Sequence, residues 1–185
     1  MPTPRRTSQE EIVTVARDIL ERHGPAHLTM QAVAERVGVR APSLYKRVRN
    51  RDDLLRLATE ATIRDLSEEL HAIDATGDPR RVLGDLARTI RAFAHARPHG
   101  YHLVFTNASA AARPDPALLA EAAAPVLNLA AVLAGPEHAL EAARTITAWT
   151  HGFISMELAG AFNLGGDVES AYEFGVDRLA DALAR

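Results

Sequence analysis

The stretch LTMQAVAERVGVRAPSLYKRVRNRDDLL, residues 28–55, decides the fold of this chain. Apolar residues recur at helical spacing over 30–37, after a threonine suited to cap the helix, and Gly38 ends the segment. A further short helix is predicted over 42–48, because proline is tolerated at the first helical position. Two short helices joined by a four-residue turn that begins with glycine are typical of a helix-turn-helix, whose second helix enters the major groove of DNA.

The two predicted helices have an apolar face and a polar face. The apolar face, which would lock the helices together, is formed by Val33, Val37, Leu44 and Val48. The polar face, which would meet base edges, carries Arg40, Ser43, Lys46 and Arg47. An ordinary helical hairpin with a solvated basic face has the same spacing, so the spacing leaves both interpretations open.

The composition favours nucleic acid as a partner. The 185 residues are 47% hydrophobic and 24% charged, as in globular proteins, and the absence of cysteine excludes a disulfide framework and a thiolate zinc site. Residues 1–51 carry ten Lys and Arg against five Asp and Glu, whereas residues 52–185 carry eleven against nineteen. This asymmetry indicates a polyanion-facing end and a body that avoids polyanions.

The rest of the chain also has helical patterns. A first helix follows Ser8, which forms a capping box with Glu11, and ends at Gly24; a fourth helix begins after Asn50. Proline and glycine signals place the later helices near 79–96, 99–106, 116–134, 137–163 and 168–184. The predicted fold class is all-α with about nine helices. A three-helix helix-turn-helix domain over 1–51 would precede a larger helical domain for ligand binding and dimerisation over 52–185.

The N-terminal region resembles the DNA-binding domain of the TetR family of repressors over about residues 8–58. The matching features are a threonine before the second helix, the Ala34-x-x-x-Gly38-Val39 pattern, the Leu44-Tyr45 pair and the Asn50-Arg51 step onto the fourth helix. The resemblance implies base contacts by Gln31, Arg40, Ala41, Pro42, Ser43 and Lys46, and phosphate contacts by Thr29, Tyr45, Arg47 and Arg51. Ala41 departs from the larger polar residues often found at its position.

Arg5 and Arg6 precede the first helix. Such residues would form an arm that reaches the minor groove, and a solvated tail is the alternative.

The short recognition helix predicts a symmetric pair of chains, because two copies on a palindrome select a site that one copy cannot. The last two predicted helices are apolar around more than one stripe, so each would face its own core and a second copy. Candidate dimer residues are Ile146, Thr150, Ile154, Leu158, Ala161, Ala171, Tyr172, Gly175, Leu179 and Leu183. Completion of a monomer core is the alternative, and the TetR resemblance implies a four-helix interface.

The larger domain carries the signs of a small-molecule sensor. The sequence Trp149-Thr150-His151-Gly152 resembles the ligand-domain signature of the TetR class named for its Trp-His-Gly motif. Large apolar residues are candidates for lining an effector cleft, or for plain core: Phe93, Tyr101, Leu103, Phe105, Leu119, Leu127, Trp149, Phe153 and Met156.

Other chemistry has little support. His95, His99 and His102 are the one hint of a metal site, but Pro98 interrupts the helix between them, so no metal or other cofactor is predicted. No phosphate loop, HExxH or GxSxG motif occurs, and the chain is not expected to be an enzyme. The N-terminus has no secretory signal, and no uninterrupted apolar run approaches the ~20 residues of a membrane span, so a soluble cytoplasmic protein is expected.

The sequence therefore predicts a ligand-responsive transcriptional repressor. It would bind a palindromic operator as a homodimer and be released by a small apolar or aromatic effector. A DNA-binding regulator or activator without an effector is the alternative, and a helical enzyme that uses the histidines with a metal is a more distant one.

Overall fold

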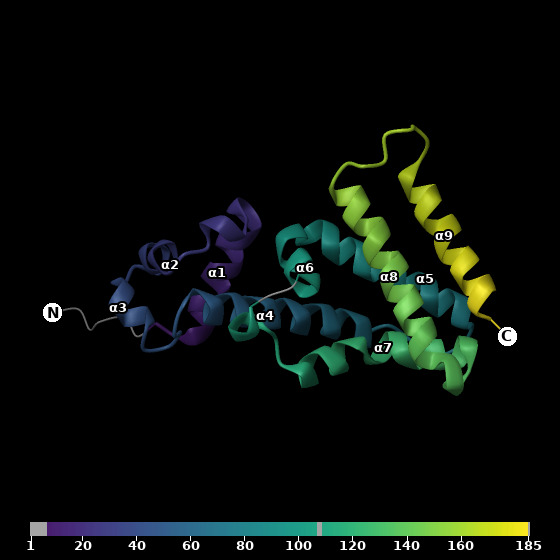
Figure 1. The fold of residues 1–185 in the computed structure, drawn as a ribbon, viewed down its shortest axis with the longest axis horizontal. Helices are drawn as coiled ribbons and strands as arrows, with labels where there is room; N and C mark the ends of the chain where they lie inside the picture. The colour runs from purple at the N-terminus through teal and green to yellow at the C-terminus, as the bar shows by residue number, and fades with distance from the viewer. Residues whose placement is uncertain (1–6, 107–108, 185) are drawn as a thin grey trace. The chain divides into compact units, whose positions relative to one another are not determined.

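The computed structural model describes residues 7–106 and 109–184, and every regular element within these ranges is helical. Its nine α-helices are α1 (Gln9–His23), α2 (Met30–Val37), α3 (Ala41–Leu44), α4 (Arg51–His71), α5 (Pro79–Ala96), α6 (Pro98–Phe105), α7 (Pro116–Ala134), α8 (Ala139–Leu158) and α9 (Val168–Leu183). Single turns of 3-10 helix occur at Pro25–His27, Ala110–Ala112 and Pro136–His138. The predicted all-α class is confirmed, and Figure 1 follows these helices along the chain.

The chain forms two compact units. Unit 1 contains the described residues of Met1–Ile63 and Arg97–Leu118, and unit 2 contains those of Arg64–Ala96 and Leu119–Arg185. The helices α4 and α7 therefore contribute residues to both units. Unit 1 is discontinuous in sequence, because it takes in the segment that contains α6.

Three helices of unit 1 begin at side-chain caps. The side-chain oxygens of Ser8, Thr29 and Asn50 each accept a hydrogen bond from the backbone N–H three residues later, at 3.0, 3.0 and 2.9 Å. These bonds satisfy N–H groups that have no partner within the helix. The helices α1, α2 and α4 consequently begin where the sequence predicts.

α6 is attached to α1 within unit 1. The carboxylate of Glu21 on α1 accepts hydrogen bonds from the backbone N–H groups of His99, at 3.1 Å, and Gly100, at 2.7 Å. These N–H groups belong to the first turn of α6, where a negative charge also interacts favourably with the helix dipole.

The recognition helix is shorter than predicted. α3 ends at Leu44 rather than near Val48, and residues 45–47 form turns. The carbonyl of Leu44 accepts from the N–H groups of both Arg47 and Val48, at 2.8 and 2.9 Å, which interrupts the regular ladder. The turn brings Val48 into the core, where it is fully buried.

α8 also ends early, at Leu158 instead of near residue 163. Gly160 has a φ of +64°, and the N–H of Ala161 bonds to the carbonyl of Met156 at 2.9 Å. This is a Schellman ending, which favours glycine because other residues are strained at positive φ.

In unit 2, α5 lies against α8 and α9, which also contact each other. Tyr172 of α9 is fully buried, and its hydroxyl donates to the carbonyl of Ala87 on α5 at 2.8 Å. A Cβ atom at Gly175 would lie 2.0 Å from Cζ2 of Trp149, so α8 and α9 approach closely because glycine occupies this position.

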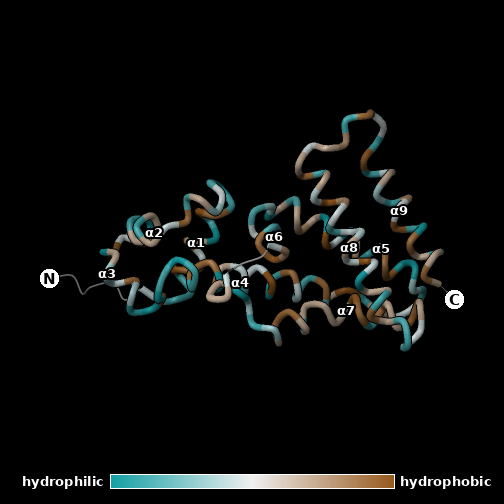
Figure 2. Tube along the Cα trace, in the orientation of Figure 1, coloured by the Kyte–Doolittle hydropathy of each residue, from teal (hydrophilic) through white to brown (hydrophobic). Residues whose placement is uncertain are grey.

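α7 is the one helix in the described ranges that is long and apolar enough to cross a membrane. The mean hydropathy of an 18-residue window of this helix is 1.8, and Figure 2 shows most of the helix in pale to dark brown. The sequence of this helix is not an uninterrupted apolar run, because it contains Glu121 and Asn128, and the helix continues through Pro125. Length and composition do not distinguish such a helix from one that belongs to a soluble domain.

Candidate nucleic-acid interface

The apolar face of the helix-turn-helix holds α2 and α3 together. Val33, Leu44 and Val48 are fully buried and Val37 is 7% exposed, which confirms the predicted apolar face. They belong to one core cluster with residues of α1, including Ile12. The recognition elements are therefore fixed on a packed three-helix base.

The opposite face of α2, α3 and the following turn is open to solvent. Seven of the predicted contact residues are exposed there, namely Gln31, Arg40, Pro42, Ser43, Tyr45, Lys46 and Arg47. Tyr45 is an aromatic residue with 55% of its surface exposed, while Ala41 is half-buried. An exposed tyrosine beside cations matches the chemistry of a phosphate contact.

The cations of unit 1 fall into two groups. Arg22 and Arg36 form ion pairs with Asp18, at 2.6 and 2.5 Å. In contrast, Arg40, Lys46 and Arg47 form no ion pair with any described residue. Three uncompensated positive charges thus lie on the turn and on the recognition segment, where a polyanion would be attracted.

Two predicted contact residues already make hydrogen bonds within α2. The hydroxyl of Thr29 caps the helix, and Nε2 of Gln31 donates to Oε1 of Glu35 at 2.6 Å. The bond to Glu35 leaves the carbonyl oxygen of the Gln31 amide and one N–H available to an adenine edge.

Arg51 has a structural role in addition to the predicted phosphate contact. Its Nε donates to the carbonyl of Leu28 at 2.9 Å, and its Nη2 donates to the carbonyl of Pro25 at 2.6 Å. It therefore joins the start of α4 to the connection between α1 and α2. The remaining predicted contacts, Arg5 and Arg6, lie outside the described residues.

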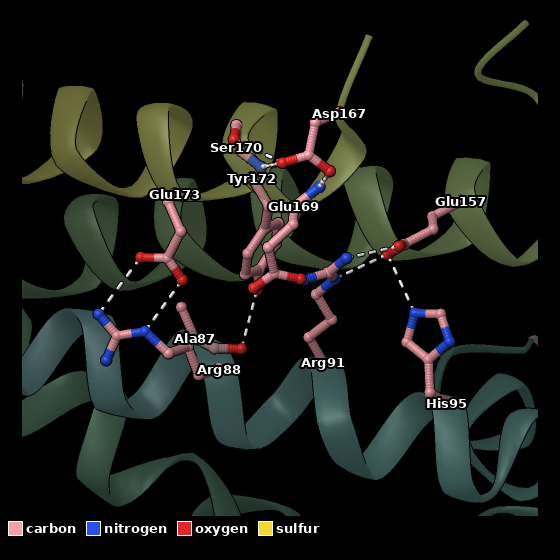
Figure 3. Close-up of polar contacts among 10 residues, drawn as sticks. All are labelled: Ala87, Arg88, Arg91, His95, Glu157, Asp167, Glu169, Ser170, Tyr172 and Glu173. Carbon is pink, nitrogen blue, oxygen red and sulfur yellow. Dashed lines mark hydrogen bonds and ion pairs between the residues drawn. The ribbon is translucent and has the colours of Figure 1, made fainter. Parts of the chain in front are cut away.

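In unit 2, arginines that project from α5 form ion pairs with the last two helices (Figure 3). Arg88 pairs with Glu173 of α9 at 2.9 Å, and Arg80 pairs with Asp181 of the same helix. Arg91 bonds to Glu157 of α8 through two nitrogens, at 2.9 and 2.7 Å. The ion pairs link α5 to both of the last two helices.

The family models match both parts of the chain. The one described as bacterial regulatory proteins, tetR family, matches residues 12–58, and the one described as tetracyclin repressor-like, C-terminal domain, matches residues 83–179, more than half of the chain. The chain belongs to the TetR family.

Relatives along the whole length agree with this assignment. An uncharacterized HTH-type transcriptional regulator of Mycobacterium tuberculosis is 31% identical over 98% of this chain and 84% of its own. The tetracycline repressor protein class A from transposon 1721, of Escherichia coli, is 31% identical over 86% of this chain and 73% of its own. A crystal structure of a protein described as regulatory has a TM-score of 0.78 and 27% identity, covering 97% of this chain and 98% of that one. TetR-family regulators are DNA-binding transcriptional repressors, a non-enzymatic class, and are usually ligand-responsive dimers.

The residues predicted to line a TetR-type effector cleft do not gather in one place. Trp149 and Phe153 belong to an aromatic cluster with Tyr172, with ring centroids 5.0 to 5.5 Å apart. Phe93 and Tyr101 are buried in different units, and burial raises the pKa of the Tyr101 hydroxyl. Leu103 is half-buried, and the exposed members are Phe105, Leu119, Leu127 and Met156.

A cavity of about 220 Å³ lies in unit 2, and none of these predicted residues lines it. Its polar side chains are His71, at the end of α4, and Asn128, on α7. The sequence signal for Asn128 was an isolated amide in the otherwise apolar second half of α7, and a prediction based on large apolar residues does not include such a residue.

The candidate dimer residues also divide by burial. Ile146, Thr150, Ile154 and Tyr172 are buried within unit 2 itself. Leu158, Ala161 and Ala171 are exposed, and Gly175, Leu179 and Leu183 are half-buried. The exposed set, rather than the whole list, is available to a second chain.

The three histidines of the metal hypothesis have separate neighbours. Nε2 of His95 lies 3.1 Å from Glu157 in unit 2, whereas Nδ1 of His99 lies 3.9 Å from Glu21 in unit 1. Among the described residues no group of three or more His, Cys, Asp or Glu is placed to hold a metal ion, and His102 joins no such group.

Proposed function

We propose that this protein is a cytoplasmic repressor that binds a palindromic operator as a homodimer and is released by a small-molecule effector. The observation that carries the proposal is the exposed face of α2 and α3, with Arg40, Lys46 and Arg47 unpaired among the described residues. A buried apolar face holds these residues on a fixed base. Positive charge attracts phosphates, and the exposed Gln31 and Arg40 have the donor geometry for adenine and guanine.

The contacts divide into two functional groups. Arg47, Tyr45 and Thr29 are proposed to hold phosphates and to set the orientation of the domain. Gln31, Arg40 and Lys46 are proposed to read base edges, and Ala41 and Pro42 offer apolar contact to a thymine methyl group. Ser43 would bond to either a base or a phosphate.

The symmetric partner is proposed to bind the exposed surface of α8 and α9. Phe174 is 66% exposed, and a Cβ at Gly152 of the Trp-His-Gly sequence would meet no atom within 4 Å. Ala148 is exposed on the same helix as Gly152, and the exposed Ala159 directly follows that helix. Small residues allow two helices to approach closely, and a large exposed aromatic side chain suits the centre of an interface.

Selection of bound DNA from a random pool tests the proposed function. We expect a palindrome with half-sites about one helical turn apart, and an affinity that falls steeply with salt. Arg47→Ala should weaken binding to all sequences alike and lower the salt slope by about 1. Gln31→Ala should instead relax the preference at one position of each half-site.

Arg22→Ala is the matched control, because Arg22 is an exposed arginine of the same unit whose charge is paired with Asp18. We expect its salt slope to equal that of the wild type. Recovery of no preferred sequence, or an equal loss in Arg22→Ala and Arg47→Ala, would contradict the proposed function. A selected site that no small molecule releases would favour the regulator without an effector.

A further inference from the structure

The cavity of unit 2 lies where the end of α4, the start of α5 and the second half of α7 meet. Apolar side chains make up most of its wall, including Leu70, Val82, Leu86 and Leu129. These four are buried, so the wall belongs to the core of the unit. Val132 also lines the cavity and is 67% exposed, and His71, Ala75, Gly77 and Asn128 of the lining are exposed as well, so the cavity opens to solvent along this side.

The connection between α4 and α5 forms one wall of the cavity and is fixed by hydrogen bonds. Nη2 of Arg81 donates to the carbonyls of Asp74 and Thr76, at 3.1 and 2.7 Å. The carboxylate of Asp74 accepts from the N–H and the hydroxyl of Thr76, at 2.9 and 2.6 Å. Because this wall is built before any ligand arrives, little ordering would oppose binding.

The two polar side chains that line the cavity, His71 and Asn128, are both exposed at its opening and have donors or acceptors that are free to bind a ligand. Nδ1 of His71 lies 2.8 Å from the carbonyl of Ser67, and since a carbonyl only accepts, this nitrogen carries the hydrogen. In the neutral ring Nε2 is then an acceptor. The amide of Asn128 forms no hydrogen bond with any described residue.

Charge is absent from the lining of the cavity. The described residues that line it include no Asp, Glu, Lys or Arg. Arg81, which fixes the connection between α4 and α5, forms an ion pair with Asp85 at 2.7 Å and hydrogen bonds with the carbonyls of Asp74 and Thr76. An ionised ligand would place its charge against a largely apolar wall and would meet no carboxylate, ammonium or guanidinium counter-ion among these lining residues.

We propose that this cavity is the effector site and that it takes a neutral hydroxylated aromatic molecule of one ring. This inference rests on the proposed function. A cavity of about 150 Å³ accommodates benzene, so about 220 Å³ accommodates one ring with a small substituent. The hydroxyl donates to Nε2 of His71 and accepts from the amide of Asn128, while the ring packs on the apolar wall.

Phenol is the probe, with benzene and benzoate as comparisons. Titration of the full-length protein, followed by NMR and by calorimetry, should show saturable binding of phenol, weaker binding of benzene and none of benzoate. His71→Phe and Asn128→Leu should each weaken phenol binding about three- to tenfold and leave benzene binding unchanged. Saturating phenol should raise the operator dissociation constant at least about fivefold.

Val132→Trp narrows the opening on the α7 side and should weaken phenol binding at least about tenfold. Leu127→Trp is the matched control, because Leu127 lies on the same helix and is exposed but does not line the cavity; it should bind phenol like the wild type. The assignment is overturned if no probe binds, if Val132→Trp binds phenol normally, if benzoate binds as tightly as phenol, or if bound phenol leaves operator affinity unchanged. Operator selection by the ligand-free protein tests the proposed function separately. If the protein selects a palindrome but binds no probe, only the assignment of the cavity is contradicted.

Discussion

At Glu157 of α8, one carboxylate faces an arginine and a histidine side chain. Arg91 donates to it twice, at 2.9 and 2.7 Å, and Nε2 of His95 lies 3.1 Å away. The hydrogen bonds from Arg91 lower the pKa of Glu157 to about 2; burial opposes this shift and His95 assists it. Arg91 also pairs with Glu169 and lies over the ring of Tyr172 at 4.9 Å. One guanidinium therefore connects α5 with both α8 and α9.

Glu157→Gln should lower the free energy of unfolding by about 2 kcal/mol at pH 7. Because the folded pKa lies below the unfolded value, the carboxylate stabilises the fold fully above about pH 4.5, and this contribution is lost as the pH falls toward 2. Urea unfolding at several pH values, followed by circular dichroism, measures the difference. Glu169→Gln removes the other, 61% exposed partner of Arg91 and should cost less than about 0.5 kcal/mol. Equal losses in the two variants at pH 7 would show that burial does not set the strength of these pairs.

The packing of α8 on α9 depends on Gly175, which lies against the indole ring of Trp149. Gly152, on α8, is also inside a helix but has open space around it. Glycine has the same low helix propensity at both positions, but an added methyl group would contact Trp149 only at position 175. Comparison of the two therefore separates packing from propensity.

Gly175→Ala should destabilise the protein by about 1–3 kcal/mol, because the added methyl group overlaps Trp149. At a protein concentration low enough for the chain to be monomeric, Gly152→Ala should instead stabilise the helix by about 0.5–1 kcal/mol. Denaturant unfolding followed by tryptophan fluorescence reads both variants, since Trp149 is the only tryptophan of the chain. A gain in stability for Gly175→Ala would mean that the indole ring has room to move.

Local signals in the sequence were enough to predict most helix boundaries. Capping side chains at Ser8, Thr29 and Asn50, and prolines at the starts of α5 and α7, act within one turn of chain. The boundaries that sequence reasoning missed depend on tertiary contacts or on weaker signals. α3 ends early because Val48 turns into the core, and α8 ends at a lone glycine, Gly160, that has no proline beside it.

The candidate site was predictable to a lesser degree. Exposed residues of the recognition face follow from helical periodicity, because the apolar face fixes which side remains outside. The bonds of Arg51 to two distant carbonyls join residues 23 and 26 positions apart, and no local pattern reports such contacts. The cavity likewise depends on how α4, α5 and α7 meet, which the composition of each helix does not determine.

For the whole molecule, two chains are required if a segment as short as α3 is to select one site. Phe174 is the largest apolar side chain exposed on α9, where it lies under Arg178 at 5.6 Å. A dimer that buries this ring has a stability that depends on protein concentration.

The Tm of the wild type should therefore rise with protein concentration, and Phe174→Glu should remove this dependence and shift the chain to monomers in sedimentation. Operator binding by Phe174→Glu should fall at least about tenfold, because each half-site is then bound separately. Leu119→Glu, which places the same charge on an exposed leucine of α7, should leave the dimer intact. A dimer that survives Phe174→Glu would place the interface elsewhere.

The discontinuity of unit 1 affects how this protein can be recombined with its relatives. A chimera that exchanges only the first 51 residues does not transfer Leu54, which belongs to the core cluster of α1, α2 and α3. It also separates the Glu21 carboxylate from the first turn of α6, whose N–H groups it accepts hydrogen bonds from. A graft that moves residues 97–118 together with the first 63 keeps both sets of partners. DNA-sequence specificity would then be transferred by two separate segments of the chain that fold together as unit 1.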